Sequence, residues 1–290
     1  MKTTLGLVIA LVALSPPARA GSQEAVSGTA TSPDGVLIRY DAAGKGDPAL
    51  VFVHCGGCER GFWDGQMAHF ATKHRVVALD LAGYGQSGVG RKDWTMPAFG
   101  QDVVSVVEAL DLKRVVLIGH SLGGPAVLEA ALRMPGRVAG LVLVDTLVDF
   151  EYRFPPEVME KALSALRADY RATTTAFLSQ YMFSASTPEP VKALVLESAL
   201  SGPPEIGVAV ARSSMAYSPL PALREIKAPI CAISSDLFPT NLEGNRKYVP
   251  GYQAAIMKGA GHYLMLEQPE AFNELLAWAL RELARSGGGR

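Results

Sequence analysis

Short runs of consecutive apolar residues recur along the chain and alternate with longer segments that carry apolar residues at helical spacing. The apolar runs lie at residues 49–54, 75–79, 114–119, 138–144, 229–234 and 252–257. The helical segments lie at residues 61–72, 96–110, 122–134, 241–248 and 269–285. Continuous apolar runs of this length are typical of strands buried on both faces. The alternation therefore predicts an α/β fold, with a mostly parallel sheet and helices on both faces.

Two regions depart from this alternation. Residues 25–31 and 36–42 alternate apolar and polar positions around a Ser-Pro-Asp-Gly turn, which predicts a β-hairpin. Residues 149–218 contain helical segments separated by prolines and no apolar strand pattern. The helical segments lie at residues 156–172, 173–181, 189–201 and 205–217. We interpret residues 149–218 as a helical cap, inserted after the sixth strand between core segments 21–148 and 219–290 and lying over the carboxyl ends of the strands.

The first 20 residues have the composition of an export signal. Lys2 supplies a positive start, residues 5–14 are apolar but too few to span a bilayer, and Ala18-Arg19-Ala20 is a small-x-small cleavage site. The sequence thus predicts a cleavable signal peptide at residues 1–20 and a periplasmic or secreted protein. A retained membrane anchor is the alternative. No membrane span is expected in the mature chain.

Composition and charge narrow the class of partner. The chain has 290 residues and is 49% hydrophobic, so it can bury a large core. Its formal net charge is −1, which gives no indication of a nucleic-acid partner. No group of His, Cys and Asp residues has the spacing of metal ligands, so no metal and no cofactor are expected. A small molecule is the expected partner, and the oligomeric state stays open.

The most informative motif is Gly119-His120-Ser121-Leu122-Gly123, which joins an apolar run to a helical segment. In that setting Gly-x-Ser-x-Gly is typical of a nucleophile elbow, a tight turn that exposes the serine at the carboxyl end of a strand. Glycines on both sides leave room where a Cβ would clash. Ser121 is therefore the candidate nucleophile.

A serine hydroxyl needs a base and a carboxylate that orients the base. Among the five histidines, His262 stands in a glycine-rich loop after the last strand, where it can reach the elbow. Asp236 follows the strand predicted at 229–234 and completes the chain order Ser, Asp, His that is usual for this elbow. We expect Asp236 to be the acid, with Asp145 as the alternative.

Acyl transfer through a serine also needs donors for the oxyanion. The Leu122 N–H lies directly after the nucleophile. The loop after the strand at 49–54, which reads His54-Cys55-Gly56-Gly57, is the expected source of the second donor. We assign that donor to the Gly56 N–H.

Taken together, these motifs resemble the α/β-hydrolase superfamily, in its capped, esterase-like branch of serine hydrolases. The resemblance also covers the glycine-rich loop that begins at Asp80, and it implies the α/β-hydrolase fold. Haloalkane dehalogenases and epoxide hydrolases of the superfamily use an Asp nucleophile, which Ser121 excludes here. Cys55 departs from the pattern, because the family usually has Gly directly after the strand-end His.

Cys55 and Cys58 form a C-x-x-C motif between a strand and a helix. In an oxidising compartment the two thiols can form a disulfide, and the placement also resembles a thioredoxin-type redox motif. Two free thiols are the third reading. The presence of the complete hydrolase motif set argues against redox catalysis. Cys231 lies within an apolar run and is expected to pack in the core.

The sequence thus predicts a serine hydrolase that cleaves carboxylic esters of small, largely apolar substrates through an acyl-enzyme intermediate. Other acyl chemistry on the same residues is an open alternative, namely lactone, thioester, amide or C–C bond hydrolysis or acyl transfer. A non-catalytic scaffold that only binds a ligand is a second alternative, because a fold does not determine a function.

Overall fold

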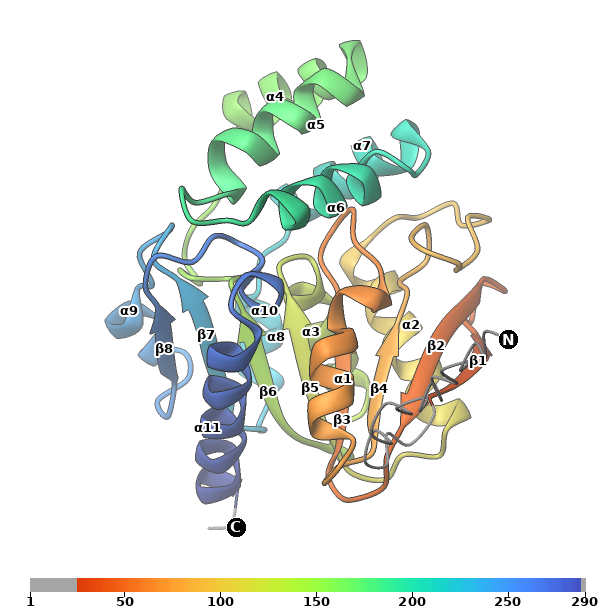
Figure 1. Ribbon diagram of the computed structural model, residues 1–290, viewed down its shortest axis with the longest axis vertical. Coiled ribbons are helices and arrows are strands. Elements are labelled where there is room, and N and C mark those ends of the chain that lie inside the picture. The colour runs from red at the N-terminus through yellow and green to blue at the C-terminus, as the bar shows by residue number, and fades with distance from the viewer. Residues whose placement is uncertain (1–24, 288–290) are drawn as a thin grey trace, which may run out of the picture.

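A single eight-stranded sheet forms the centre of the molecule (Figure 1). The structure is a computed structural model, and it describes residues 25–287. The signal peptide expected at residues 1–20 lies outside the described residues. Within the described part of the chain, no helix is both long and apolar enough to cross a membrane.

The strands follow the order β1-β2-β4-β3-β5-β6-β7-β8. Their bounds are β1 (Val26–Thr31), β2 (Leu37–Ala43), β3 (Ala49–Val53), β4 (Val76–Leu79), β5 (Val115–His120), β6 (Val138–Val144), β7 (Ile230–Ser235) and β8 (Gln253–Met257). The hairpin of β1 and β2 is antiparallel and pairs with β4 antiparallel, and all other pairs are parallel. The mostly parallel sheet predicted from the apolar runs is confirmed.

Helices cover both faces of the sheet. On one face α1 (Asp64–Phe70), after the short η1 (Arg60–Trp63), and α11 (Pro269–Gly287) pack over the strands. On the other face lie α2 (Met96–Ala109), α3 (Gly123–Arg133) and α8 (Leu220–Glu225). Alternate residues of one strand enter the two cores, as Val51 and Phe52 of β3 do. This explains why the central strands are apolar at every position.

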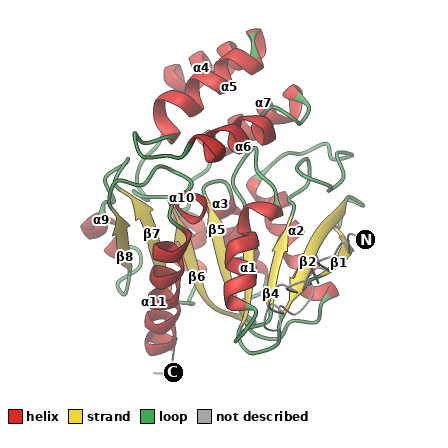
Figure 2. Cartoon of the chain, in the orientation of Figure 1, coloured by secondary structure: helices red, strands yellow, loops and turns green. Residues whose placement is uncertain are grey.

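Residues 149–218, between β6 and β7, are helical without strands and lie over the carboxyl ends of the strands as a cap (Figure 2). It contains α4 (Pro156–Ala168), α5 (Tyr170–Phe177), the π-helical η2 (Leu178–Met182), α6 (Glu189–Ala199) and α7 (Pro204–Ala216). The prediction of a single helix at 156–172 is wrong. The helix ends before Asp169, whose backbone is extended. The Asp169 side chain caps α5 by accepting the Ala172 N–H.

Two short helices were not predicted from the pattern of apolar residues. They are α8, directly before β7, and α10 (Leu264–Glu267), directly before α11. Each is six residues or shorter, so neither is long enough to repeat the helical period. The remaining helix, α9 (Leu242–Arg246), lies between β7 and β8. Short α10 follows His262 immediately and so belongs to the surroundings of the candidate site.

Candidate active site

Ser121 occupies a strained turn between β5 and α3. Its φ is +52°, in the left-handed region that a serine rarely adopts. Three hydrogen bonds fix the turn. The Ser121 N–H donates to the Val144 carbonyl at 3.0 Å, and the Ser121 carbonyl accepts the Gly124 N–H at 2.9 Å and the Thr146 hydroxyl at 2.7 Å. A Cβ on Gly119 would lie 2.3 Å from the Gly123 carbonyl oxygen. The geometry is that of the nucleophile elbow predicted from the motif.

His262 lies at the same edge of the sheet and pairs with a buried carboxylate. Its Nδ1 lies 2.6 Å from Oδ2 of Asp145, and each residue is only 6% exposed. The other oxygen of Asp145 accepts the Ser235 N–H at 2.7 Å and the Ser235 hydroxyl at 2.9 Å. Both carboxylate oxygens are thus hydrogen-bonded, which is the condition for keeping a charge in such a buried place.

The expected pairing of His262 with Asp236 is wrong. Asp236 is exposed, and its carboxylate accepts the Gly259 N–H at 2.9 Å. The strands β6 and β7 are neighbours, so both aspartates lie at the same edge of the sheet. Asp145 follows β6 directly and Asp236 follows β7 directly, but Asp145 has a φ of +44° and is buried, whereas Asp236 is exposed to solvent. Asp145, the alternative from the sequence, holds the histidine.

His120 supports the same loop from the end of β5. Its Nε2 donates to the carbonyl of His262 at 2.9 Å, and the two rings lie 4.5 Å apart. Burial, together with the neighbouring His262, keeps the pKa of His120 well below its ordinary value of 6.5. A neutral His120 therefore acts as a hydrogen-bond donor and packing partner rather than as a charge.

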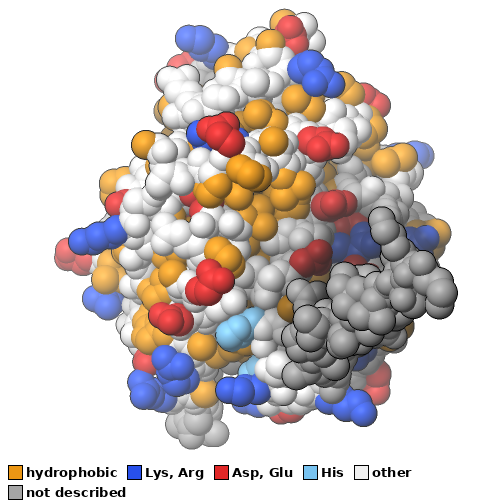
Figure 3. Space-filling model, in the orientation of Figure 1, with side chains coloured by type: hydrophobic (Ala, Val, Ile, Leu, Met, Phe, Trp, Pro, Cys, Tyr) orange, Lys and Arg blue, Asp and Glu red, His pale blue; other side chains and the backbone are white. Residues whose placement is uncertain are grey.

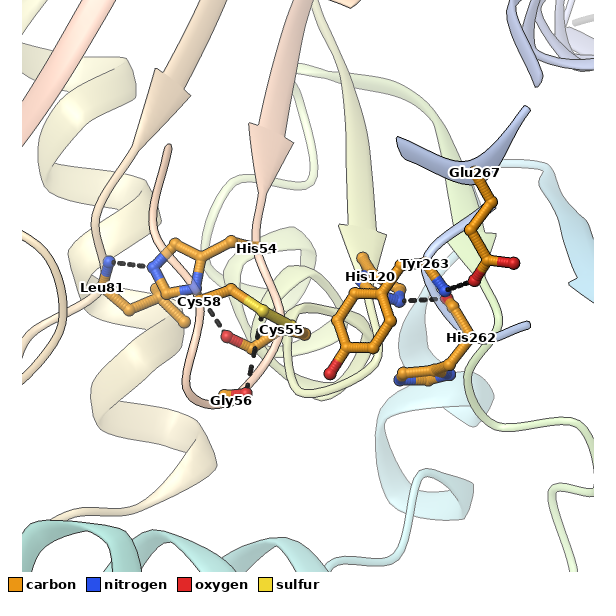
Figure 4. The surroundings of a disulfide bond; sticks show 9 residues. All are labelled: His54, Cys55, Gly56, Cys58, Leu81, His120, His262, Tyr263 and Glu267. Carbon is orange, nitrogen blue, oxygen red and sulfur yellow. Dashed lines mark hydrogen bonds between the residues drawn. A yellow bond between two sulfur atoms is a disulfide. The ribbon is translucent and has the colours of Figure 1, made fainter. Parts of the chain in front are cut away.

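The loop after β3 is held from two sides. The Leu81 N–H donates to Nε2 of His54 at 2.9 Å, so Nδ1 carries the proton and donates to the Cys55 carbonyl at 2.6 Å. Burial lowers the pKa of His54, in keeping with a neutral ring. Cys55 and Cys58 are joined by a disulfide, and both are buried (Figure 4).

Gly56 lies at the tip of this loop, beside the residue that follows the nucleophile. A Cβ placed on Gly56 would be 3.7 Å from Cδ2 of Leu122. The two backbone positions expected to supply the oxyanion donors are therefore neighbours in the structure. Leu122 is the N-cap residue of α3, where free N–H groups and the helix dipole favour negative charge.

The disulfide also belongs to an apolar cluster that joins the core to the cap. The cluster consists of Cys55, Cys58, Phe62, Leu178, Met182, Val195, Ala199 and Tyr263. Its members come from the loop after β3, from η1, from η2 and α6 of the cap, and from the residue after His262. The region next to Gly56 is thus bordered by apolar side chains.

Comparison with known proteins gives the family. The sequence profile of the Alpha/beta hydrolase family matches residues 50–275, which is most of the chain. The chain belongs to this family. Among curated relatives, the non-heme chloroperoxidase of Streptomyces lividans is 36% identical over 152 residues, which are 49% of this chain and 55% of that enzyme. The matched stretches span 30% to 55% of the first relatives' own lengths.

Solved structures share the fold over a larger part of the chain. A thermophilic esterase from Thermogutta terrifontis is 25% identical and superposes with a TM-score of 0.76, covering 90% of this chain and 99% of the esterase. An enzyme described as degrading N-acyl homoserine lactones is 27% identical with a TM-score of 0.74, covering 87% and 99%. A bromoperoxidase from Bacillus anthracis, 19% identical with a TM-score of 0.79, covers 88% and 100% and shows the fold alone.

Several residues around this family site were not predicted from the sequence. Ser235 binds Asp145, Thr146 binds the Ser121 carbonyl, and Glu267 binds the loop that carries His262. For Ser235 and Thr146 the only signal is a polar residue at or just beyond the end of a buried strand. Glu267 follows His262 by five residues at the end of a one-turn helix, a spacing too short to show a period.

Proposed function

We propose that this protein is a serine hydrolase that cleaves carboxylic esters of small, largely apolar substrates through an acyl-enzyme intermediate. The observation that carries the proposal is the buried His262–Asp145 pair at the edge of the sheet where Ser121 occupies a strained turn. Nucleophile, base and acid on three neighbouring loops are the arrangement that activates a serine hydroxyl.

In the proposed reaction His262 Nε2 takes the Ser121 proton while Oγ attacks the acyl carbon. Asp145 fixes the proton of His262 on Nδ1 and stabilises the imidazolium that forms. The Leu122 and Gly56 N–H groups bind the oxyanion. His262 then protonates the alcohol as it leaves. Water, deprotonated by the same histidine, attacks the acyl-enzyme and releases the carboxylic acid and the free Ser121.

Three observations support an ester and an apolar substrate. The esterase from Thermogutta terrifontis shares the fold over nearly its whole length. The loop with Gly56 is bordered by the apolar cluster of Cys55 and its partners from the cap. Hydrophobic side chains also gather on the surface where the cap lies over the core (Figure 3). Phe177, Tyr181 and Leu194 of the cap are exposed.

Lactone hydrolysis is the second candidate, because the lactone-degrading enzyme, at 27% identity, superposes on this chain over 99% of its own length. A lactone is a cyclic ester, so the same residues would open it, with the alcohol remaining attached to the acyl group. A shape preference of the pocket, rather than a different mechanism, would separate the two candidates.

We further propose that the protein is exported, with residues 1–20 removed. The Cys55–Cys58 disulfide supports this location, because structural disulfides persist in oxidising compartments.

Turnover of chromogenic esters with acyl chains of increasing length, and of γ- and δ-lactones, tests the proposal. We expect the mature protein to hydrolyse short to medium apolar esters, and Ser121→Ala to lose roughly 10⁴-fold or more in kcat. Ser164→Ala, at an exposed position on α4, is the matched control and should behave as the wild type. Fluorophosphonate labelling at Ser121 measures the nucleophile without any substrate.

The outcomes separate the alternatives. Turnover of lactones with little turnover of open-chain esters would favour the second candidate. Labelling of Ser121 without turnover would leave the nucleophile active but make the ester class wrong. A wild-type protein that neither turns over nor becomes labelled would overturn the proposal in favour of a non-catalytic scaffold.

A further inference from the structure

Glu267 binds the backbone on both sides of His262. Its Oε2 accepts the Gly261 N–H at 2.7 Å. Its Oε1 accepts the Tyr263 N–H at 3.1 Å (Figure 4). The carboxylate comes from α10, which follows the loop directly. One side chain therefore fixes the peptide units that precede and follow the histidine.

The cap contributes a third donor to the same carboxylate. The Thr187 hydroxyl lies 3.0 Å from Oε2 of Glu267. Because that hydroxyl already accepts the Ser184 N–H at 2.8 Å, its proton is free to be donated to Glu267. Thr187 is buried, at 3% exposed.

The cap also binds His262 itself. The His262 N–H donates to the Met182 carbonyl at 2.8 Å, at the end of η2. Three consecutive N–H groups, from Gly261 to Tyr263, are thus all hydrogen-bonded, two to Glu267 and one to the cap. A Cβ on Gly261 would lie 2.5 Å from Oε1 of Glu267, so only glycine allows the carboxylate this close.

We propose that Glu267 is a positioning residue for His262 and that Thr187 orients the Glu267 carboxylate from the cap. The inference rests on the proposed function in one respect, the role of His262 as the base. In the described part of the chain no Lys or Arg forms an ion pair with Glu267. Its partners are the loop of His262 and the cap, so its contacts serve this site.

The physical basis is the strength and direction of hydrogen bonds to a carboxylate. Such bonds are shorter and roughly twice as strong as neutral ones, and two of them fix a backbone segment against rotation. A misplacement of a catalytic group by about 1 Å can cost about 10²-fold in rate. Replacing the Glu267 carboxylate by an amide keeps the shape of the side chain. The single amide oxygen can still accept one of the two backbone N–H groups, but the NH₂ group then faces the other N–H and cannot accept it.

Glu267→Gln is the first variant. We expect kcat on the best ester to fall about 10- to 100-fold while KM changes less than about threefold, because the base is displaced and the apolar contacts to substrate remain. Glu270→Gln, at an exposed position in the first turn of α11, is the matched control and should keep the wild-type kcat. Unchanged kcat in Glu267→Gln would overturn the proposal.

Thr187→Val, which keeps the shape and removes the hydroxyl, tests the link to the cap. We expect a loss of about fivefold in kcat, recovered by Thr187→Ser because serine restores the donor. If Thr187 acts through Glu267, the double variant Thr187→Val with Glu267→Gln is no slower than Glu267→Gln alone. Multiplying losses in the double variant would overturn the link. If Glu267→Gln fails to fold, the comparison of Thr187→Val with Thr187→Ser still decides the case.

A spectroscopic readout separates this inference from the proposed function. The low-field proton resonance of the His262 Nδ1–H, identified by its loss in His262→Gln, reports the bond to Asp145 without any substrate. We expect it to shift or broaden in Glu267→Gln and to stay in place in Glu270→Gln. If wild type turns over no ester and is not labelled at Ser121, the proposed function fails, and this resonance still tests Glu267. An unmoved resonance would overturn the positioning role.

Discussion

Asp145 combines the features of a carboxylate that must stay charged inside a protein. It is buried, its backbone turns inward at a φ of +44°, and its two oxygens take three hydrogen bonds from His262 and Ser235. The Ser235 N–H cannot rotate away, so it fixes which oxygen faces the histidine. The second oxygen is then left for His262 Nδ1 alone.

This arrangement makes Asp145→Asn a sharp test of the acid. The carbonyl oxygen of Asn would remain with the two Ser235 donors, so the NH₂ group would face Nδ1. His262 would then carry its proton on Nε2 and could not accept the Ser121 proton. We expect kcat to fall by roughly 10⁴-fold with the fold intact, measured on the best ester of the panel.

Asp236→Asn is the matched control for this prediction. Asp236 is exposed and its contact is the Gly259 N–H, which an Asn carbonyl can also accept. We expect less than about a threefold change in kcat. The reverse order, with Asp236→Asn inactive and Asp145→Asn active, would restore the assignment made from chain order.

At the scale of elements, the loop after β3 joins the oxyanion position to the cap. Cys55 and Cys58 flank Gly56, and a Cβ on Gly57 would lie 3.0 Å from the Ala199 backbone of α6. The disulfide closes a loop of four residues, for which chain entropy predicts a contribution of about 2 kcal/mol to the free energy of unfolding. The disulfide should also restrict the position of the Gly56 N–H.

Replacing both cysteines, as Cys55→Ser with Cys58→Ser, should therefore lower both kcat and the free energy of unfolding. We expect kcat to fall about tenfold, less than the loss of a whole oxyanion donor, because the Gly56 N–H remains but moves more freely. Steady-state kinetics and urea unfolding measure the two effects. Cys231→Ala, in β7 and away from this loop, is the control for thiol loss. A double variant with wild-type kcat would show that the disulfide does not position the oxyanion donor.

Elements with strong periodicity could be predicted from the sequence. The strand expected at 138–144 is β6 residue for residue, and the elbow follows from glycines at fixed positions around Ser121. The break of the first cap helix at Asp169 was missed, because an Asp is tolerated inside a helix and its capping geometry is not encoded in spacing.

The acid and the positioning residues could not be predicted from the pattern, for a different reason. Chain order places Asp236 and Asp145 at the same edge of the sheet, and only the direction of each side chain decides which one meets His262. Glu267 and Thr187 are 80 residues apart in sequence, and their contact depends on how the cap packs on the loop of His262. Neither direction nor packing is visible in a one-dimensional pattern.

At the scale of the whole molecule, the buried histidines link folding to pH. His54 and His120 are at most 1% exposed, and burial lowers the pKa of each below the ordinary value of 6.5. Below about pH 6.5 the unfolded chain therefore binds protons that the folded chain does not. The free energy of unfolding must fall as pH falls through that range, by up to about 1.4 kcal/mol per pH unit for each histidine.

The variant His120→Gln isolates one of these contributions, since glutamine can still donate to the His262 carbonyl. We expect its free energy of unfolding to be lower than that of the wild type at pH 7.5 but to decline less steeply between pH 6.5 and 5.5, by about 1 kcal/mol per pH unit. Urea unfolding at several pH values measures both slopes, and His69→Gln, at an exposed position on α1, should keep the wild-type slope. Equal slopes in wild type and His120→Gln would mean that folding does not lower the pKa of His120. The His120 ring would then gain a positive charge beside His262 as the pH falls through this range.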